Sequence, residues 1–348
     1  MAQKIKVVQC GLGFAGASLI RSMLLKRTVE CVGAVDKYNG VGRDVGDVLG
    51  LGTETGIRVT DDIDEAVGGS KPDVWIEATQ SKIVDIYPRV KKALSSGINV
   101  ITLAEEFANP WYFEPELTKE IDAIAKKNNV TMVGTGFNPG LWLDVWPFFL
   151  SGCVYHIDKI KIQYMSDLSP YGRSPDVVKN YGFGLKPAEI EGSLKNGSDK
   201  SSKGTIGIIH NLAGCLGFEL SDVRVRVRPL ISTVRQDFSP VVVIEPGEIH
   251  GSMVDAYGIC NGKEIIEIHK GACCKPSLEV PGFGEEPHTE AVIEIVGEPN
   301  LKSSLSLKSE NGWSTTAPRL LNWIPFIMKA KPGLLTDLRD FPLMGAIY

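Results

Sequence analysis

The sequence predicts an α/β protein with two domains: a doubly wound parallel sheet, followed by an α+β domain built on a mainly antiparallel sheet. Three observations support this prediction. Residues 1–138 alternate apolar strand-like runs with helical stretches, as in a parallel sheet covered by helices. A glycine-rich turn separates the first strand from the first helix. After Asn138 the pattern changes to strands in which apolar and polar residues alternate.

The first domain is expected to contain five parallel strands that are apolar along most of their length, because helices cover both faces of such a sheet. The expected strands are residues 4–10, 30–36, 73–79, 99–103 and 130–134. The expected helices between them include residues 15–26, 84–95 and 115–127. Ligands of a doubly wound sheet bind beyond the carboxyl ends of its strands, so the residues there are candidates for a binding site.

The turn after the first strand has the sequence Gly11-Leu12-Gly13-Phe14-Ala15-Gly16, and Asp36 follows near the end of the next strand. Gly11 permits a sharp turn, Gly13 permits close approach of a pyrophosphate, and Gly16 permits tight packing of the helix on the sheet. The N–H groups at the helix N-terminus then face the phosphates. This complete context predicts a Rossmann-type dinucleotide site. A tight turn in another kind of α/β protein is the alternative.

Asp36 is the residue expected to set cofactor selectivity. A carboxylate at this position favours NAD, because it binds the ribose 2′-hydroxyl and repels a 2′-phosphate. Lys37 and Arg43 complicate this prediction, since either cation can pair with a 2′-phosphate, although both are also ordinary charges for a solvated loop. We therefore expect NAD as the cofactor, with NADP also accepted.

Polar residues follow the other strands and converge on the same edge of the sheet. Thr79-Gln80 at the end of the third strand and the apolar Leu103 at the end of the fourth are expected to contact the cofactor, and Glu105-Glu106 come directly after the fourth strand. A glutamate in an apolar site beside a second negative charge is suited to acid/base catalysis, whereas two acids at a helix start are the alternative. Asn138 follows the fifth strand and is expected to bind the nicotinamide carboxamide or the substrate, or else to cap the next helix.

The second domain is expected to begin with a helix at Asn138-Pro139, because Asn suits an N-cap and Pro suits the first helical position. Strands are expected from His156 onward and at residues 223–228, 240–245, 251–260, 263–269 and 291–296. Residues 171–203 are rich in Gly, Pro and Ser and are expected to form a long loop or lid. A helix is expected from residue 315 to about residue 329.

These patterns divide the chain into a dinucleotide-binding domain, a substrate-binding and dimerisation domain, and a C-terminal helix and tail that return to the first domain. The expected boundaries are residues 1–138, 139–312 and 313–348.

Composition excludes several classes of partner. The 37 basic and 42 acidic residues give a formal net charge of −5 with no basic block, so nucleic acid is not expected to bind. The longest nearly apolar segment, residues 140–149, is too short to span a bilayer, so no membrane interaction is expected. The seven cysteines and five histidines lack metal-ligand spacing, so no metal site is expected. An odd number of cysteines fits the reducing cytoplasm.

The residues resemble those of the 2,4-diaminopentanoate dehydrogenase family and the related amine dehydrogenases. The similarity lies in the glycine-rich turn, in Glu105-Glu106 after an Ile-Thr strand end, in the block Gly-Thr-Gly-Phe-Asn-Pro-Gly at 134–140, and in residues 316–334. This resemblance implies a fold shared with 4-hydroxy-tetrahydrodipicolinate reductase and an NAD(P) cofactor. It implies that Glu105 rather than Glu106 is the acid/base residue.

The resemblance also implies oxidative deamination of a small amine, 2,4-diaminopentanoate, to 2-amino-4-oxopentanoate and ammonia. Such a substrate has a carboxylate that needs a cation, for which Arg173 and Lys179 are candidates. The antiparallel sheet offers a surface for a homodimer. A reductase of a cyclic imine such as dihydrodipicolinate and a non-catalytic NAD-sensing protein remain the alternatives. The reductase family's lysine-rich substrate segment and histidine pair are absent from this sequence.

Overall fold

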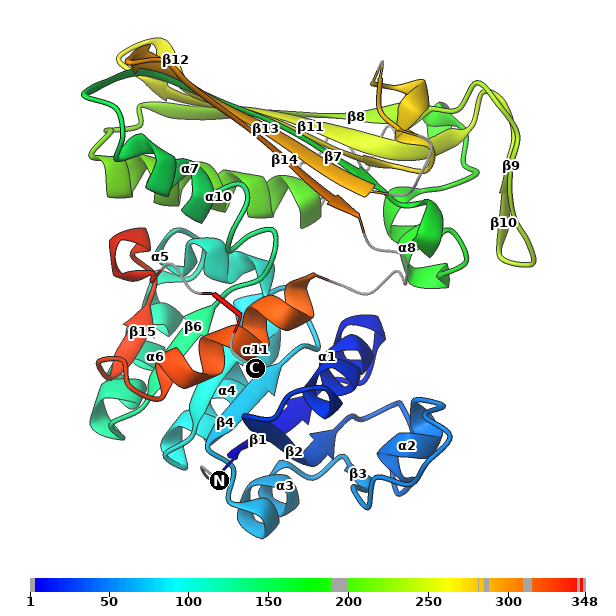
Figure 1. Ribbon diagram of the computed structural model, residues 1–348, viewed down its shortest axis with the longest axis vertical. Coiled ribbons are helices and arrows are strands. Elements are labelled where there is room, and N and C mark those ends of the chain that lie inside the picture. Colours follow the sequence, from blue (N-terminus) through cyan, green and yellow to red (C-terminus); the bar gives the residue numbers. More distant parts are fainter. Residues whose placement is uncertain are drawn as a thin grey trace. The chain divides into compact units, whose positions relative to one another are not determined.

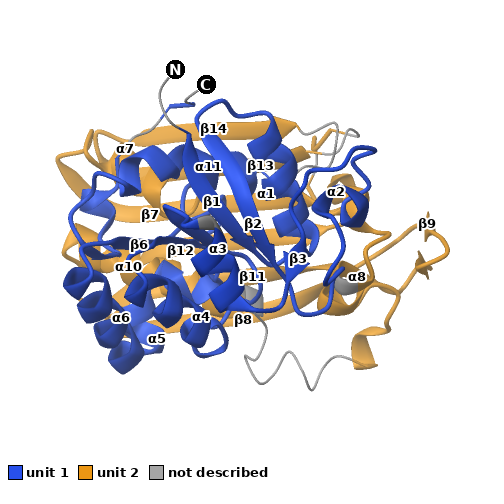
Figure 2. Ribbon diagram, turned by 90° about the horizontal axis from the view of Figure 1, so that it is seen from below, with its two compact units in different colours: residues 1–141, 314–348 blue, residues 142–313 orange. Residues whose placement is uncertain are grey.

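A computed structural model describes residues 4–189, 200–280, 282–284, 288–308, 315–342 and 345–346. The chain forms two compact units (Figure 2). The first unit comprises residues 1–141 and 314–348, and the second comprises residues 142–313. The expected boundary between residues 312 and 313 lies outside the described residues. Residues 190–199 of the expected lid, 171–203, also lie outside them.

The first unit contains a parallel sheet of seven strands in the order β15-β6-β5-β4-β1-β2-β3 (Figure 1). Its strands are β1 (Ile5–Cys10), β2 (Val29–Val35), β3 (Val59–Thr60), β4 (Val74–Glu77), β5 (Asn99–Thr102), β6 (Thr131–Gly134) and β15 (Gly333–Leu335). The strand order reverses between β1 and β4. Crevices at such reversal points are where doubly wound sheets bind their ligands.

Helices cover both faces of this sheet, which confirms the predicted doubly wound fold. On one face the core includes residues of α1 (Phe14–Leu24), α2 (Val45–Val48) and α11 (Thr316–Ile327). On the other face it includes residues of α3 (Ile63–Ser70), α4 (Ile83–Ser95) and α6 (Pro115–Lys127). The short helices η1 (Glu105–Ala108) and α5 (Pro110–Phe113) follow β5.

The prediction of a helix starting at Asn138-Pro139 was wrong. Residues 138–144 form turns, and Gly140 has a φ of +118°, which a right-handed helix does not accept. The next helix is α7 (Val145–Ser151), and the side chain of Asp144 caps it by accepting a hydrogen bond from the Val145 N–H. Asn138 is therefore not a helix cap.

The second unit contains a six-stranded sheet in the order β14-β13-β7-β12-β11-β8. Its strands are β7 (His156–Asp167), β8 (Asp222–Ile231), β11 (Ile249–Cys260), β12 (Lys263–Cys273), β13 (His288–Glu298) and β14 (Leu301–Lys308). Only β7 and β12 pair in parallel, which confirms the predicted mainly antiparallel sheet. A separate hairpin pairs β9 (Gln236–Phe238) with β10 (Val242–Ile244).

Helices α7 and α10 (Lys200–Leu216) lie on the same face of this sheet (Figure 1). Helix α10 was not predicted, because its first turn, Lys-Ser-Ser-Lys-Gly, reads as part of a polar loop. The expected lid also contains a helix, α8 (Pro175–Tyr181), which begins at a proline in the first helical position.

The opposite face of the six-stranded sheet carries charged side chains that pair across strands. A Cβ on Gly258 would lie 2.7 Å from Ile209 of α10, so alternation places Asp255 on the face away from that helix. His269 lies 2.6 Å from Asp255 through Nδ1 and 2.6 Å from Glu267 through Nε2. Partial burial by itself lowers the pKa of His269, but hydrogen bonds and charge from these two carboxylates outweigh it and raise the pKa.

We expect His269 to contribute a pH-dependent part of the stability. Because its pKa is higher in the folded protein, the contribution is complete below the ordinary histidine value of about 6.5 and is lost as the pH rises through the folded-state pKa. The measurement is the free energy of unfolding of wild type and His269→Asn at several pH values. The difference between them should shrink as the pH rises, and a constant difference would contradict the assignment.

Candidate cofactor and catalytic site

The glycine-rich turn brings the start of α1 against the end of β1. Gly11 has a φ of +91°, and a Cβ there would lie 2.7 Å from the carbonyl oxygen of Ala78. A Cβ on Gly16 would overlap the carbonyl oxygen of Gly11. Both positions therefore require glycine for packing within the protein.

Gly13 differs from the other two glycines because a Cβ there would meet no atom within 4 Å among the described residues outside its chain neighbours and its own helix backbone. Gly13 is the N-cap of α1, no side chain caps this helix, and its first turn contains no acidic residue. Open space beside an uncapped helix N-terminus fits a pyrophosphate, which accepts hydrogen bonds from the backbone N–H groups. The residues of this turn, including Leu12, Phe14 and Ala15, thus fit a dinucleotide.

Asp36 is buried directly after β2, and its carboxylate holds the glycine-rich turn in place. Oδ2 accepts hydrogen bonds from the Leu12 N–H at 2.7 Å and from the Asn39 side chain at 3.1 Å. Oδ1 accepts from the N–H groups of Tyr38 and Asn39, both at 2.8 Å. Burial alone would raise the pKa of Asp36, but these hydrogen bonds outweigh it and lower the pKa.

The charges that complicate the prediction of NAD selectivity are exposed. Lys37 and Arg43 both lie at the surface of the loop after β2. The ammonium of Lys37 lies 5.6 Å from the centre of the Tyr38 ring. These positions place two cations on the segment that follows Asp36.

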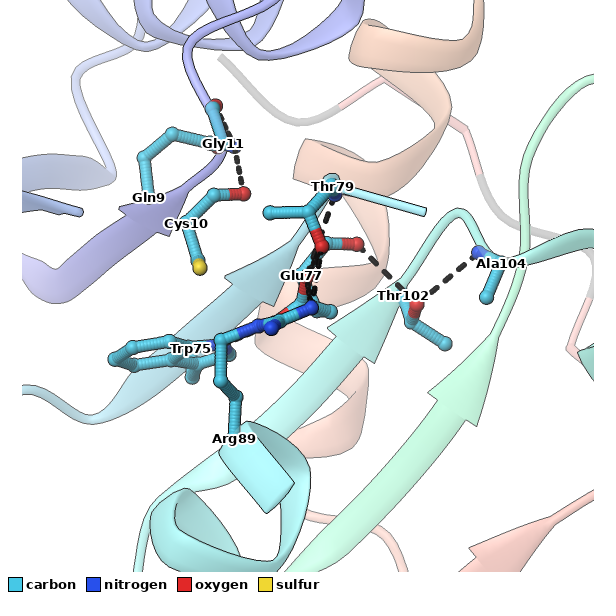
Figure 3. Close-up of polar contacts among 9 residues, drawn as sticks. All are labelled: Gln9, Cys10, Gly11, Trp75, Glu77, Thr79, Arg89, Thr102 and Ala104. Carbon is cyan, nitrogen blue, oxygen red and sulfur yellow. Dashed lines mark hydrogen bonds and ion pairs between the residues drawn. The ribbon is translucent and has the colours of Figure 1, made fainter. Parts of the chain in front are cut away.

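Glu77, at the end of β4, was not among the predicted site residues. Its side chain is completely buried and accepts hydrogen bonds from Arg89 of α4, from the Trp75 indole and from the N–H and hydroxyl of Thr79 (Figure 3). The Glu77 carbonyl oxygen also accepts from Thr102 Oγ1 at 3.2 Å. A single acid ending an otherwise apolar strand was the sequence signal for this cluster.

Glu105 and Glu106 have different surroundings, although they are adjacent at the start of η1. Glu106 is buried, and its Oε2 accepts a hydrogen bond at 2.9 Å from the N–H of Ile83, the first residue of α4. Its own N–H donates to the carbonyl oxygen of Ser81 at 3.1 Å. Glu105 is half-buried. The carboxylate of Glu106 thus caps α4, whereas Glu105 is more exposed than its neighbour.

The loop after β6 contains polar atoms without partners. Both side-chain polar atoms of Asn138 and the hydroxyl of Thr135 are shielded from solvent, and none has a hydrogen-bond partner among the residues that the structure describes. Buried polar groups are normally paired, so such atoms fit a ligand that supplies both donors and acceptors. The N-terminal end of α11 supports this loop, since Thr316 Oγ1 accepts from the Phe137 N–H at 3.4 Å.

The structure thus places most of the predicted residues at the carboxyl edge of the first unit's sheet. Gln80 is exposed beside Thr79, and the N–H of Leu103 donates to the Glu77 carbonyl oxygen at 3.1 Å. Arg173 and Lys179 belong to the second unit, where both are exposed. Arg173 donates from Nε to the carbonyl oxygen of Ser239 at 3.2 Å.

Within the described residues, no group of three or more His, Cys, Asp or Glu side chains is arranged to hold a metal ion. The described part of the chain also has no helix that is both long and apolar enough to cross a membrane.

A model of the 2,4-diaminopentanoate dehydrogenase C-terminal domain matches residues 141–348, which is more than half of the chain. A 2,4-diaminopentanoate dehydrogenase of Acetoanaerobium sticklandii is 31% identical over 99% of this chain and 95% of its own length. The chain belongs to the 2,4-diaminopentanoate dehydrogenase family. It is therefore an NAD(P)-dependent oxidoreductase that acts on a carbon bearing an amine.

Solved structures agree with this family. An amine dehydrogenase from Mycobacterium smegmatis has a TM-score of 0.83 at 26% identity, covering 99% of this chain and 98% of that one. A dipicolinate-bound dihydrodipicolinate reductase from a Paenisporosarcina species has a TM-score of 0.54 at 14% identity, covering 98% and 100% of the two chains. The reductase shows a shared fold alone, and the predicted relation of this family to the reductase fold is confirmed.

We expect Glu106→Ala to destabilise the protein by about 1 kcal/mol, the usual effect of losing a helix-capping acceptor. The free energy of unfolding from denaturant titration measures this change. Glu106→Gln keeps a side-chain oxygen for the Ile83 N–H and should lose less. Equal stability of the alanine variant and the wild type would show that the cap contributes nothing.

Proposed function

We propose that this enzyme oxidatively deaminates 2,4-diaminopentanoate to 2-amino-4-oxopentanoate and ammonia, in a reversible reaction. The observation that carries the proposal is the half-buried Glu105 on the strand-end edge that holds the glycine-rich turn and Asn138. The likeness to a 2,4-diaminopentanoate dehydrogenase supports the choice of substrate.

Deamination of a protonated amine needs a base before it needs an oxidant. An ammonium has no lone pair with which to assist loss of hydride from its carbon, so Glu105 first takes a proton from the nitrogen. Bound NAD(P)⁺ supplies the hydride acceptor. Glu105 releases this first proton to solvent, and loss of hydride leaves an iminium on the substrate, to which water adds as the Glu105 carboxylate takes up a water proton. Glu105 then passes that proton to the nitrogen, and ammonia leaves as Glu105 takes the proton of the new hydroxyl group, which becomes the ketone.

The position of Glu105 suits these steps. It begins η1 directly after β5, and the backbone around it is fixed by the hydrogen bonds of Glu106 to Ser81 and Ile83. A carboxylate held there also stabilises the positive charge of the iminium. General acid/base catalysis of this kind contributes about 10²- to 10⁴-fold to a rate.

Asn138 is proposed to bind the nicotinamide carboxamide or the substrate. Its amide offers one acceptor and two donors, and both side-chain polar atoms lack partners among the described residues. A primary carboxamide has the complementary pair of groups, so Asn138 can satisfy it with two hydrogen bonds.

Further residues are proposed to bind the substrate carboxylate and to select between NAD and NADP. The cation for the substrate carboxylate is proposed to be Arg173 or Lys179, both of which are exposed in the second unit. Asp36 is proposed to favour NAD, and Lys37 and Arg43 to let NADP bind as well. The first unit is accordingly proposed as the dinucleotide-binding domain and the second as the substrate domain. The enzyme is proposed to work in the cytoplasm.

We expect Glu105→Gln to bind NAD as tightly as the wild type and to lower kcat for 2,4-diaminopentanoate by about 10²- to 10⁴-fold, because the amide cannot accept a proton. Steady-state absorbance of the reduced nicotinamide and calorimetric NAD binding measure the two effects. Glu106→Gln is the matched control and should retain most of kcat. Turnover by Glu105→Gln near the wild-type rate would overturn the assignment of the base.

A homodimer is proposed to form through the charged face of the six-stranded sheet. Arg226 lies on this face, on the edge strand β8, because it pairs across strands with Asp255 of β11. Glu290 and Glu294 lie on the same charged face near the other edge of the sheet, on β13. They alternate along this strand with Ala291 and the other buried residues, which face the helices. Two copies related by a twofold axis along the strands bring these opposite charges together.

We expect Arg226→Glu to weaken this dimer, because it places like charges opposite the glutamates of the second copy. Sedimentation equilibrium at several protein concentrations measures the dissociation constant. Lys119→Glu is the control, since it makes the same change of charge on the exposed side of α6 in the first unit. Equal dissociation constants for the two variants would argue against this face.

A further inference from the structure

The buried Glu77 and the partly buried Arg89 form an ion pair, and both groups hydrogen-bond to the Thr79 hydroxyl. Arg89 donates to Glu77 from Nε at 3.0 Å and from Nη2 at 3.3 Å, so the two charges compensate each other at the end of β4. The Trp75 indole donates to the same carboxylate at 3.3 Å. Glu77 is completely buried, and these fixed partners hold its oxygens in place.

The Thr79 hydroxyl lies between the two charged groups (Figure 3). A carboxylate without a proton only accepts hydrogen bonds, so the single hydroxyl hydrogen of Thr79 points to Glu77 Oε1. A guanidinium only donates, and Arg89 Nη2 donates to Thr79 Oγ1 at 2.6 Å. The Thr79 N–H is also committed to Glu77, at 3.3 Å. The hydroxyl therefore retains one free lone pair and no hydrogen.

Thr79 is exposed, and it borders the glycine-rich turn. Its Cγ2 atom would lie 3.0 Å from a Cβ on Gly11, and the carbonyl oxygen of Ala78 would lie closer still. This location is between the ends of β1 and β4, where the strand order reverses. The Thr79 methyl group lies against the turn, and its hydroxyl lies beside the turn at this reversal point, where doubly wound sheets bind their ligands.

We propose that the Glu77–Arg89 pair is a positioning element that makes Thr79 an obligate hydrogen-bond acceptor for the nicotinamide nucleoside of the cofactor. The group it accepts from is either the carboxamide N–H or a ribose hydroxyl, since both are donors. A phosphate oxygen has no hydrogen to offer and is disfavoured at this point. The inference rests on dinucleotide binding by this family and not on the identity of the amine.

The first test measures cofactor binding without turnover. Thr79→Val has nearly the same shape but offers no lone pair, and we expect it to raise the Kd for NAD by about five- to tenfold, as for loss of one hydrogen bond. Thr79→Ser keeps the hydroxyl and should restore tight binding. Isothermal titration calorimetry gives the Kd values, and thermal unfolding checks that the variants remain folded.

An analogue of the cofactor distinguishes the two donors. In 3-acetylpyridine adenine dinucleotide a methyl ketone replaces the carboxamide, so the ring substituent has no N–H while the ribose is unchanged. If Thr79→Val weakens NAD but not the analogue, the donor is the carboxamide. If it weakens both equally, the donor is a ribose hydroxyl. Unchanged Kd values for both ligands in a folded Thr79→Val protein overturn the proposal.

A second variant tests the ion pair as the source of this polarity. Glu77→Gln keeps the volume of the side chain but replaces one accepting oxygen with an NH₂ group, which no longer fixes the Thr79 hydrogen. We expect this variant to weaken NAD binding in the same direction as Thr79→Val, and the double variant to be no weaker than Thr79→Val alone. Additive losses would show that Glu77 does not act through Thr79. Failure of amine oxidation alone would leave these binding results unaffected.

Discussion

The contact between Gly16 of α1 and the carbonyl oxygen of Gly11 is the constraint on which the geometry of the candidate cofactor site depends. It leaves no room for a side chain, so the helix starts directly against the end of β1. Asp36 then fixes the same turn from β2 through the Leu12 N–H, and Ala78 and Thr79 approach it from β4. Three neighbouring strands thus hold one turn rigid, which keeps the backbone donors of α1 in a fixed orientation before a ligand arrives.

The sequence was sufficient to predict five of the strands in the first unit, β1, β2, β4, β5 and β6, and the helices α1, α4 and α6 between them, because each of these apolar runs is bounded by clear turn residues. It was insufficient for α10, whose polar first turn is helical only because the rest of the helix packs on β11. Strand β15 was missed because three residues show no periodicity, and they become a strand only by pairing with β6. Tertiary contacts decided the structure of both segments.

In the candidate site, too, some features could be predicted from the local sequence and others depend on tertiary contacts. Glycines, Asp36 and Glu105-Glu106 are recognisable from their places after strands, so sequence reasoning found them. The different surroundings of the two glutamates depend on which N–H each carboxylate meets, and the capping of Ile83 by Glu106 spans 23 positions of sequence. The pairing of Glu77 with Arg89 likewise depends on the packing of α4 against β4. Such pairings have no sequence pattern of their own.

Residues 314–348 belong to the first unit, and this has a consequence for the order in which the two units are completed during translation. Helix α11, with its completely buried Trp323, and strand β15 both belong to that unit, although they are encoded after the whole of the second unit. The second unit is in effect an insertion within the first. During translation it emerges in full while the first unit still lacks an edge strand and part of its core. The first unit is therefore completed only after the whole of the second unit has been made.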